Sequence, residues 1–351
     1  MQHIAPKDFV ATVLKWQQQH GRHDLPWQQP ATPYRVLVSE IMLQQTQVVT
    51  VIPYFQRWMQ AFPNISALAN ASEDQVMALW QGLGYYSRAR NLQKAARYIE
   101  HELGGEFPRE LKQLEMIPGV GRYTAGAIRS FAYDNYGPIV DGNVRRLFCR
   151  LFAIEGQPTA AAVNKALWQQ AERLTPEHNN RHFAQGLLDL GATLCKPRNP
   201  ECPRCPFNHA CAAYTQNRVG ELPTAKLKKT LPTKTGHFLW LANKANVMLS
   251  KRPDTGIWAS LWCLPEVSEA PAAATLVATF KHTFSHYKLN AKVWQPEADA
   301  AIRSELIGSE LKEASNHYQC AHINLQNIHE FGLPAPMLKL LNKLLREDGN
   351  G

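Results

Sequence analysis

The amino-acid sequence predicts a two-part protein, with an all-α region over residues 1–217 followed by a smaller α/β domain over residues 235–351. Three observations support this division. Apolar residues recur at helical spacing in the first region, a basic stretch with prolines follows it, and short β-prone runs come after that stretch. A length of 351 residues with 45% hydrophobic residues suits about two globular domains with sizeable cores. This composition excludes a wholly disordered chain.

The predicted helices of the first region carry apolar residues three and four positions apart. The clearest such sets are Phe9, Val13, Trp16; Val36, Leu37, Ile41, Leu43; Val48, Val51, Ile52, Phe55; and Val76, Leu79, Leu83. Prolines separate the stretches, at Pro33, Pro53, Pro63, Pro108, Pro118 and Pro138. Ser72 and Gln75 have the spacing of a capping box, which predicts a helix start.

The second part begins after a basic stretch. Residues 218–234 carry five Lys and Arg side chains against the single acid Glu221, which predicts an exposed linker between domains. Beyond it, His237–Leu241 and Tyr287–Val293 are rich in β-branched, aromatic and other apolar residues and predict strands. The leucine-rich stretch Pro336–Arg346 predicts a final helix.

The overall charge is positive, with 38 Lys and Arg against 29 Asp and Glu. A net charge of +9 favours a polyanionic partner such as nucleic acid. No run reaches the ~18–20 apolar residues of a membrane span, and the first fifteen residues lack the apolar core of a signal peptide. We therefore expect a cytoplasmic protein that does not bind membranes.

Four of the seven cysteines lie close together, at Cys195, Cys202, Cys205 and Cys211. Six, two and five residues separate them, so four thiolates can converge on one metal centre. By spacing alone, a zinc ion and an iron–sulfur cluster both fit. The other three, Cys149, Cys263 and Cys320, are isolated and are expected to be small buried apolar side chains.

A glycine turn between two apolar faces marks residues 112–132. Pro118 ends the first helix, and Gly119 and Gly121 permit a tight backbone turn with positive φ. The second helix then begins with free N–H groups that favour a phosphate. We interpret the segment as a helix–hairpin–helix that grips DNA backbone without reading its sequence, with a plain helical corner as the alternative.

Two acids stand in unusual positions. Glu40 lies inside an apolar helical stretch, where it is either at a surface edge or buried with a raised pKa. Asp141 follows the apolar pair Ile139 and Val140 and is placed to cap a helix. One protonated and one ionised carboxyl group together could protonate a leaving base and stabilise the sugar cation that it leaves.

The hairpin, Asp141 and the cysteine spacing together resemble the helix–hairpin–helix DNA glycosylases with an iron–sulfur cluster, and within them the adenine DNA glycosylase (MutY) family. Further strings that carry the resemblance are 25–27, 39–46, 82–92 and 140–144. The resemblance implies a [4Fe–4S] cluster on the four cysteines. It implies removal of adenine paired with 8-oxoguanine or guanine in double-stranded DNA, by a protein that we expect to be a monomer.

The resemblance also implies roles for single residues. Glu40 would protonate adenine, Asp141 would stabilise the sugar cation, and Asn143 and Tyr123 would help to hold them. Residues expected to contact DNA or the flipped base are Gln45, Thr46, Tyr85, Gly119, Gly121 and Trp27, the last with a core position as the alternative. The related endonuclease III has a lysine where this chain has Tyr123, so strand cleavage through a Schiff base is not expected. Lys196, Arg198 and Arg204 of the cysteine loop are candidate phosphate contacts.

The C-terminal domain resembles the MutT-like (Nudix) fold through residues 249–253 and 256–265. The acidic box that binds magnesium in Nudix hydrolases is absent after Pro265, so the domain is expected to bind and not to hydrolyse. Phe284, Ser285 and His286 match the loop that recognises 8-oxoguanine in the adenine glycosylase family. Without the resemblance, this segment is a β-turn with a buried phenylalanine.

Overall fold

The computed structural model describes residues 4–225, 230–243, 245–297 and 319–348. Parts of the predicted linker (226–229) and of the predicted C-terminal domain (244, 298–318 and 349–351) lie outside the described residues. The chain forms two compact units, one of Met1–Ala69 with Asn91–Lys228, and one of Asn70–Arg90 with Lys229–Gly351. Among the described residues, no helix is both long and apolar enough to cross a bilayer.

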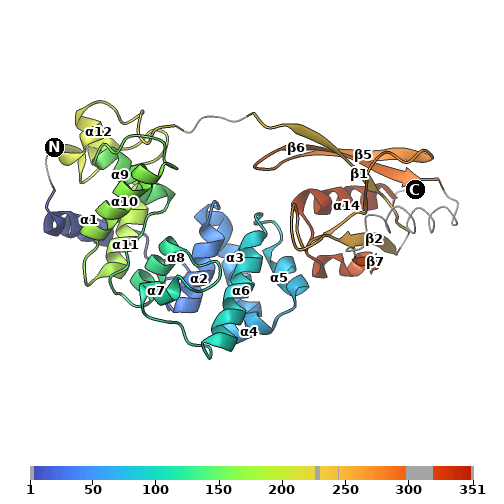
Figure 1. Cartoon of the computed structure of the whole chain (residues 1–351), viewed down its shortest axis with the longest axis horizontal. Coiled ribbons are helices and arrows are strands. Elements are labelled where there is room, and N and C mark those ends of the chain that lie inside the picture. Colours follow the sequence, from blue (N-terminus) through green and yellow to red (C-terminus); the bar gives the residue numbers. More distant parts are fainter. Residues whose placement is uncertain (1–3, 226–229, 244, 298–318, 349–351) are drawn as a thin grey trace. The chain divides into compact units, whose positions relative to one another are not determined.

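The first unit is built from helices, as predicted (Figure 1). They are α1 (Pro6–His20), α2 (Pro33–Leu43), α3 (Val48–Ala61), α4 (Ile65–Asn70), α6 (Ser87–Glu102), α7 (Leu111–Leu114), α8 (Arg122–Ala127), α9 (Gly142–Leu151), α10 (Ala161–Leu174), α11 (Asn180–Asp189) and α12 (Ala212–Thr215). Short π-helical turns, η1 (Ile128–Ala132) and η2 (Leu190–Leu194), extend α8 and α11. Two 3₁₀ turns, η3 (Cys202–Arg204) and η4 (Asn208–Ala210), shape the cysteine loop.

The core of this unit joins its two ends. Phe9 of α1 packs against Phe183 of α11 and Phe148 of α9, with ring centroids 6.1 and 6.3 Å apart. Gly186 of α11 allows the close approach of α1, because a Cβ there would stand 2.7 Å from Val13 Cγ1. The N-terminal helix is thereby fixed to α11, which lines the candidate site described below.

One proline does not end a helix. Pro53 lies inside α3, contrary to the prediction that it separates two stretches. Proline removes one backbone donor, but Val51, Phe55 and Trp58 on the same helix are all buried. Their packing holds the helix together across the missing hydrogen bond.

The second unit carries all the strands of the described residues (Figure 1). One sheet has the order β4 (Glu266–Val267), β1 (Thr233–Leu239), β6 (Lys288–Pro296), β5 (Ala274–Thr283), and the other has the order β3 (Trp262–Cys263), β2 (Asn246–Lys251), β7 (Gln319–Asn324). β1 and β6 are parallel, whereas β5 and β6 form an antiparallel hairpin. The 3₁₀ turn η5 (Leu325–Glu330) precedes α14 (Ala335–Asp348), the predicted last helix, whose Met337 and Leu341 are in the core with Val247 and Val293.

Residues 70–90, which the sequence assigns to the helical region, pack with the C-terminal residues. α5 (Glu73–Trp80) begins at the predicted capping box of Ser72 and Gln75. Asp74 in its first turn accepts hydrogen bonds from Lys251 Nζ at 2.8 Å and Trp262 Nε1 at 3.1 Å. The Tyr86 hydroxyl donates to the carbonyl of Leu333 at 3.0 Å. The sequence pattern around residues 70–90 could not predict these contacts, because the partner residues lie far along the chain.

The start of the predicted linker contacts the helical unit at Leu222, whereas Gly220, Glu221 and Ala225 are exposed. Leu222 is 2% exposed, and its carbonyl accepts a hydrogen bond from Arg150 Nε of α9 at 2.8 Å. Arg218 is paired with Glu155 and Glu221, which neutralises the charge that suggested solvent exposure. Residues 218–225 group with the helical unit, and the linker itself stays a prediction.

Candidate active site

Glu40 is buried in α2. The Thr32 hydroxyl caps this helix and Pro33 opens it, after which Tyr34–Met42 form a nearly continuous buried run. Glu40 is 5% exposed, so the surface alternative is wrong. Burial raises the pKa of Glu40 to about 7, with the negative charge of Asp141 adding to the rise and a hydrogen bond from Tyr123 opposing it. At neutral pH this carboxyl group is poised between its acid and its anion.

Tyr123 holds the Glu40 carboxyl group in place. Its hydroxyl donates to Glu40 Oε2 at 2.5 Å. Burial and the nearby carboxylates raise the pKa of Tyr123 well above its usual value, so the phenol keeps its proton and acts as the donor. Tyr123 lies in the first turn of α8, directly after the glycine turn. Its hydrogen bond therefore connects the predicted hairpin to Glu40.

Asp141 caps α9, as its position after an apolar pair predicts. Its carboxylate accepts hydrogen bonds from the Val144 N–H at 2.6 Å and from Asn143 Nδ2 at 2.9 Å. Burial raises the pKa of Asp141, while these two hydrogen bonds and the charge of Arg146 favour the anion. Asp141 also acts electrostatically on Glu40 and Tyr123, so the two acids belong to one electrostatic site.

A chain of hydrogen bonds runs from Asp141 to the cysteine loop. Asn143 Oδ1 accepts from Arg146 Nη2 at 2.9 Å, and Arg146 Nε donates to the carbonyl of Cys195 at 2.6 Å. The same arginine donates to the Gly191 carbonyl at 2.7 Å. Gly191 permits this packing, because a Cβ there would stand 2.7 Å from Asn143 Cβ.

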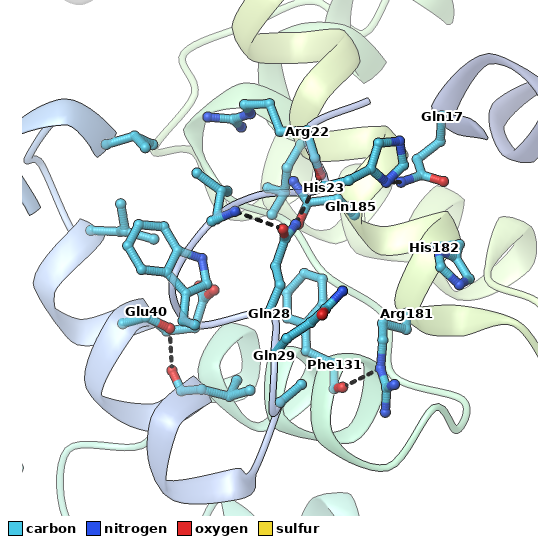
Figure 2. A pocket seen from close by; sticks show the side chains of 18 residues that line it. Gln17, Arg22, His23, Gln28, Gln29, Glu40, Phe131, Arg181, His182 and Gln185 are labelled. Atoms are coloured by element: carbon cyan, nitrogen blue, oxygen red, sulfur yellow. Dashed lines mark hydrogen bonds between the residues drawn. The ribbon is translucent and has the colours of Figure 1, made fainter. Parts of the chain in front are cut away.

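Glu40 faces a cavity of about 200 Å³ in the helical unit (Figure 2). Trp27 lines it and packs edge-on against Phe55 at 5.5 Å, so this side chain is 7% exposed and serves both the cavity and the core. Asp141, Asn143 and Tyr123 are not among the lining residues. Tyr123 is hydrogen-bonded to Glu40, Asp141 acts on Glu40 electrostatically, and Asn143 is hydrogen-bonded to Asp141. The other polar lining residues are Gln17, Arg22, His23, Gln28, Gln29, Ser39, Arg181, His182 and Gln185.

Sequence reasoning missed a buried acid, Asp189, that binds two residues lining this cavity, Arg22 and Gln185. Asp189 is fully buried, and it accepts hydrogen bonds from the Arg22 backbone N–H at 2.8 Å and from Arg22 Nε at 2.6 Å. Gln185 Nε2 also donates to Asp189, at 2.9 Å. A lone acid within Leu187–Leu190 is the same signal that singled out Glu40, so Asp189 was detectable. Its partner Arg22, 167 residues away, was not.

The four clustered cysteines are all free and line one small cavity. Its walls include apolar side chains of α9 and the loop, and Arg150 Nη1 lies 3.4 Å from Cys195 Sγ. Burial raises the pKa of the Cys205 thiol to about 11. Of the isolated cysteines, Cys149 and Cys263 are buried as expected, but Cys320 is exposed on β7.

The cysteine loop offers fewer free charges than expected. Lys196 and Arg204 both pair with Glu201, at 2.7 and 2.6 Å. Arg198 is exposed. Two of the three candidate phosphate contacts are therefore already engaged by an acid within the same loop.

The glycine turn has the expected form with one difference. Gly119 has a φ of +79°, and a Cβ there would stand 2.9 Å from Asn91 Cβ, so only glycine fits. Gly121 has a φ of −92°, contrary to the positive φ allowed for it. Nothing surrounds the place of its absent side chain, so the backbone at the start of α8 is open. Gln45, with a φ of +59°, is exposed in the turn between α2 and α3, and Thr46 beside it is half-buried.

A second cavity lies within the other unit. The turn that contains Tyr85 lines it, together with residues 256–259 and the predicted recognition residues Phe284, Ser285 and His286. Tyr85 is 55% exposed with a φ of +47°. Phe284–Tyr287 form the loop of the β5–β6 hairpin, in which the Phe284 N–H donates to the Tyr287 carbonyl at 2.9 Å. The structure thus brings together residues that the sequence places 200 positions apart.

Comparisons with known proteins agree with both units. The family described as HhH-GPD superfamily base excision DNA repair protein matches residues 38–173, and the NUDIX domain family matches residues 237–343. An adenine DNA glycosylase of Buchnera aphidicola (from Acyrthosiphon pisum) is 38% identical over 95% of this chain and 96% of its own length. The mouse adenine DNA glycosylase is 39% identical over 84% of this chain and 72% of its own length.

Solved structures confirm the predicted helical fold. A thermostable thymine-DNA glycosylase matches with a TM-score of 0.55 and 30% identity over 60% of this chain and 97% of its own. An endonuclease III bound non-covalently to DNA matches with a TM-score of 0.52 over 61% of this chain and 99% of its own, at 21% identity. With its helical glycosylase fold, its C-terminal Nudix domain and near full-length similarity to curated relatives, the chain belongs to the adenine DNA glycosylase family of the HhH-GPD superfamily.

Proposed function

We propose that this protein hydrolyses the N-glycosidic bond of adenine opposite 8-oxoguanine or guanine in double-stranded DNA and does not cut the strand. The observation that carries the proposal is the Glu40 carboxyl group, which faces a cavity with a pKa near 7 beside the Asp141 carboxylate. An acid and an anion in one buried site are what glycosidic bond cleavage needs.

The chemistry divides between these two groups. Adenine leaves the helix stack and enters the cavity, at a lower cost where it is mispaired. The protonated Glu40 gives its proton to N7 of adenine, which makes the base a better leaving group. Asp141 stabilises the positive charge that develops on the sugar, and Asn143 keeps that carboxylate oriented. Glu40, now an anion, accepts a proton from the water that attacks the sugar, which restores the acid.

The absence of an amine at position 123 supports a glycosylase without lyase action. A Schiff base requires a lysine or amino-terminal nitrogen near the sugar, and the phenol of Tyr123 cannot form one. Four residues after Asp141, Arg145 instead donates to the Pro158 carbonyl and to Asn164. Guanidinium groups stay protonated and are not nucleophiles.

We infer that Cys195, Cys202, Cys205 and Cys211 hold a [4Fe–4S] cluster. By spacing the four cysteines fit a zinc ion or a cluster, and the resemblance to the iron–sulfur glycosylases favours the cluster. Four thiols around one cavity fit a larger centre. Burial raises the pKa of the Cys205 thiol, and a bound metal centre would favour its thiolate. Purified protein should contain about four irons per chain, and zinc in their place would contradict the assignment.

The exposed turn of Gly119–Gly121 supports backbone binding to DNA, and Tyr85 is placed in an exposed turn from which it can enter the vacated stack. Ser285 and His286 are exposed at the tip of the β5–β6 loop, with 3.3 Å between Ser285 Oγ and His286 Nδ1. Their polar groups can hydrogen-bond to the lesion base opposite adenine.

Incubation with duplexes that contain one adenine opposite 8-oxoguanine, guanine or thymine tests the function. We expect release of free adenine from the first two duplexes and strand breaks only after alkali. Retained adenine in the presence of folded, iron-loaded protein would contradict the proposal. A protein–DNA adduct trapped by borohydride would show a lyase instead, and binding without base release would show a non-enzymatic DNA-binding protein.

A further inference from the structure

A short loop between β2 and β3 holds a tryptophan in an unusual backbone conformation. Trp258 has a φ of +52°, a region that L-residues with bulky side chains rarely adopt. Its neighbours share this irregularity, with Gly256 at +82° and Ser260 at +60°. Such strain persists only where surrounding contacts enforce it, and it concentrates at functional sites.

Two arginines enforce this conformation. Arg252 Nε donates to the carbonyl of Ile257, directly before the tryptophan, at 2.8 Å. Arg90 Nη1, from the first turn of α6, which belongs to the same unit as Trp258, donates to the carbonyl of Ala259, directly after it, at 2.5 Å. The Ser260 N–H closes the loop on the Pro253 carbonyl at 2.8 Å. The backbone on both sides of Trp258 is therefore clamped by charged donors, which form stronger hydrogen bonds than neutral ones.

The clamped tryptophan points its ring at the recognition loop. Its ring centroid lies 5.2 Å from that of Phe284 in an edge-to-face arrangement, and 5.6 Å from that of His282. Phe284 in turn packs against Tyr287 at 4.9 Å and His286 at 6.4 Å. Trp258 is only half-buried, so its ring is a wall of the second cavity and not a member of a closed core.

The loop tip itself has few other supports. Ser285 and His286 are exposed, and among the described residues one backbone hydrogen bond crosses the turn, from the Phe284 N–H to the Tyr287 carbonyl. Phe284 anchors the tip to the core of this unit, and Trp258 supplies an aromatic contact to that anchor from outside the β5–β6 hairpin.

We propose that Trp258 is a positioning residue for base recognition: through Phe284 it sets where Ser285 and His286 meet the base opposite adenine. This inference rests on the proposed function. The residue touches no reacting atom and lies in a different unit from Glu40, so it acts on the choice of opposite base and not on bond cleavage.

The test is single-turnover excision of adenine opposite 8-oxoguanine and opposite guanine by the full-length protein. Trp258→Ala should lower the ratio of the two rates at least about tenfold, mainly through the 8-oxoguanine duplex, with excision opposite guanine within about twofold of wild type. Trp258→Phe, which restores an aromatic edge, should recover most of the ratio. Trp294→Leu is the matched control, because that tryptophan stacks on His237 and does not line the cavity.

The outcomes separate this inference from the function beneath it. A wild-type protein with no preference between the two duplexes overturns the proposed recognition and the role of Trp258 with it. A wild-type preference that Trp258→Ala keeps, or equal losses on both duplexes, overturns only the role of Trp258. If Trp258→Ala does not fold, Trp258→Leu takes its place and the same ratio decides.

Discussion

The two cavities of this protein are built in opposite ways. The cavity at Glu40 is lined by this buried acid and by Arg22 and Gln185, which both donate hydrogen bonds to the buried Asp189 beside it. The cavity at Phe284 is lined by half-exposed aromatic rings on strained loops. Proton transfer needs a dry environment that shifts a pKa, whereas recognition of a base needs an accessible edge at a defined place. Changes in the first cavity should therefore affect rate, and changes in the second should affect the choice of substrate.

The largest expected effect is that of Glu40→Gln. The amide keeps the size of the side chain but has no proton to donate, so adenine excision should fall about 10²- to 10⁴-fold. Binding of the mispaired duplex, measured by gel shift, should be retained. Glu172→Gln is the control, because Glu172 is about half exposed and forms a surface ion pair with Arg122. Near-normal turnover of Glu40→Gln would remove this residue from the acid role.

Asp189→Asn tests the buried acid that holds Arg22 and Gln185 beside the same cavity. The change leaves the half-buried Arg22 without its anion and weakens the hydrogen bonds to a buried acceptor, which should destabilise the protein by about 1–3 kcal/mol. We expect excision to fall about 10- to 100-fold with the preference for the opposite base unchanged, because Gln185 and Arg22 lose their common anchor. Thermal unfolding and the two-duplex assay measure these effects. Glu155→Gln, in an exposed pair, should change neither.

Ser285→Ala examines the second cavity alone. Loss of one hydrogen bond to the opposite base costs about 1 kcal/mol, so the preference for 8-oxoguanine over guanine should fall about five- to tenfold. Excision opposite guanine should not change. Thr279→Ala on the same hairpin serves as control. If Ser285→Ala slowed both duplexes equally, the separation of rate from recognition would fail.

The smallest expected effect is a shift in pH dependence. The Tyr123 hydroxyl stabilises the Glu40 anion and so lowers its pKa, which burial has raised to about 7. Tyr123→Phe removes that opposing contribution, so the pKa rises further and the acid stays protonated to higher pH. The alkaline limb of kcat/KM should move upward from about 7, with a few-fold change in rate at neutral pH. A limb that moves downward would mean that Tyr123 stabilises the acid and not the anion.

The features that the sequence alone could predict were those formed by residues close together along the chain. The fold class, the glycine turn, the cysteine spacing and the capping box of Ser72 each depend on residues within about twenty positions, where local geometry restricts the chain. Asp141 as a helix cap belongs to the same group. The family resemblance added roles for residues such as Tyr85 and Ser285 that no local pattern assigns.

Contacts between residues far apart along the chain could not be predicted from the sequence. The ion pair of Asp189 with Arg22, the contact of Trp258 with Phe284 and the packing of residues 70–90 with the C-terminal unit all join distant segments. The contacts of residues 218–225 with the helical unit were missed for the same reason, since the buried Leu222 and its partner Arg150 are 72 residues apart. Periodicity and propensity report only on neighbours along the chain.

The sequence by itself determined which chemical groups the protein possesses and in which local elements they stand, because helix caps, glycine turns and cysteine spacings act over a few residues. Only the tertiary structure decided that the Glu40 carboxyl is buried beside Tyr123 and Asp141, and that the recognition loop is held from outside its own hairpin. The reason is that a pKa and a side-chain position depend on the solvent excluded and the charges gathered around a group, and folding alone brings those together.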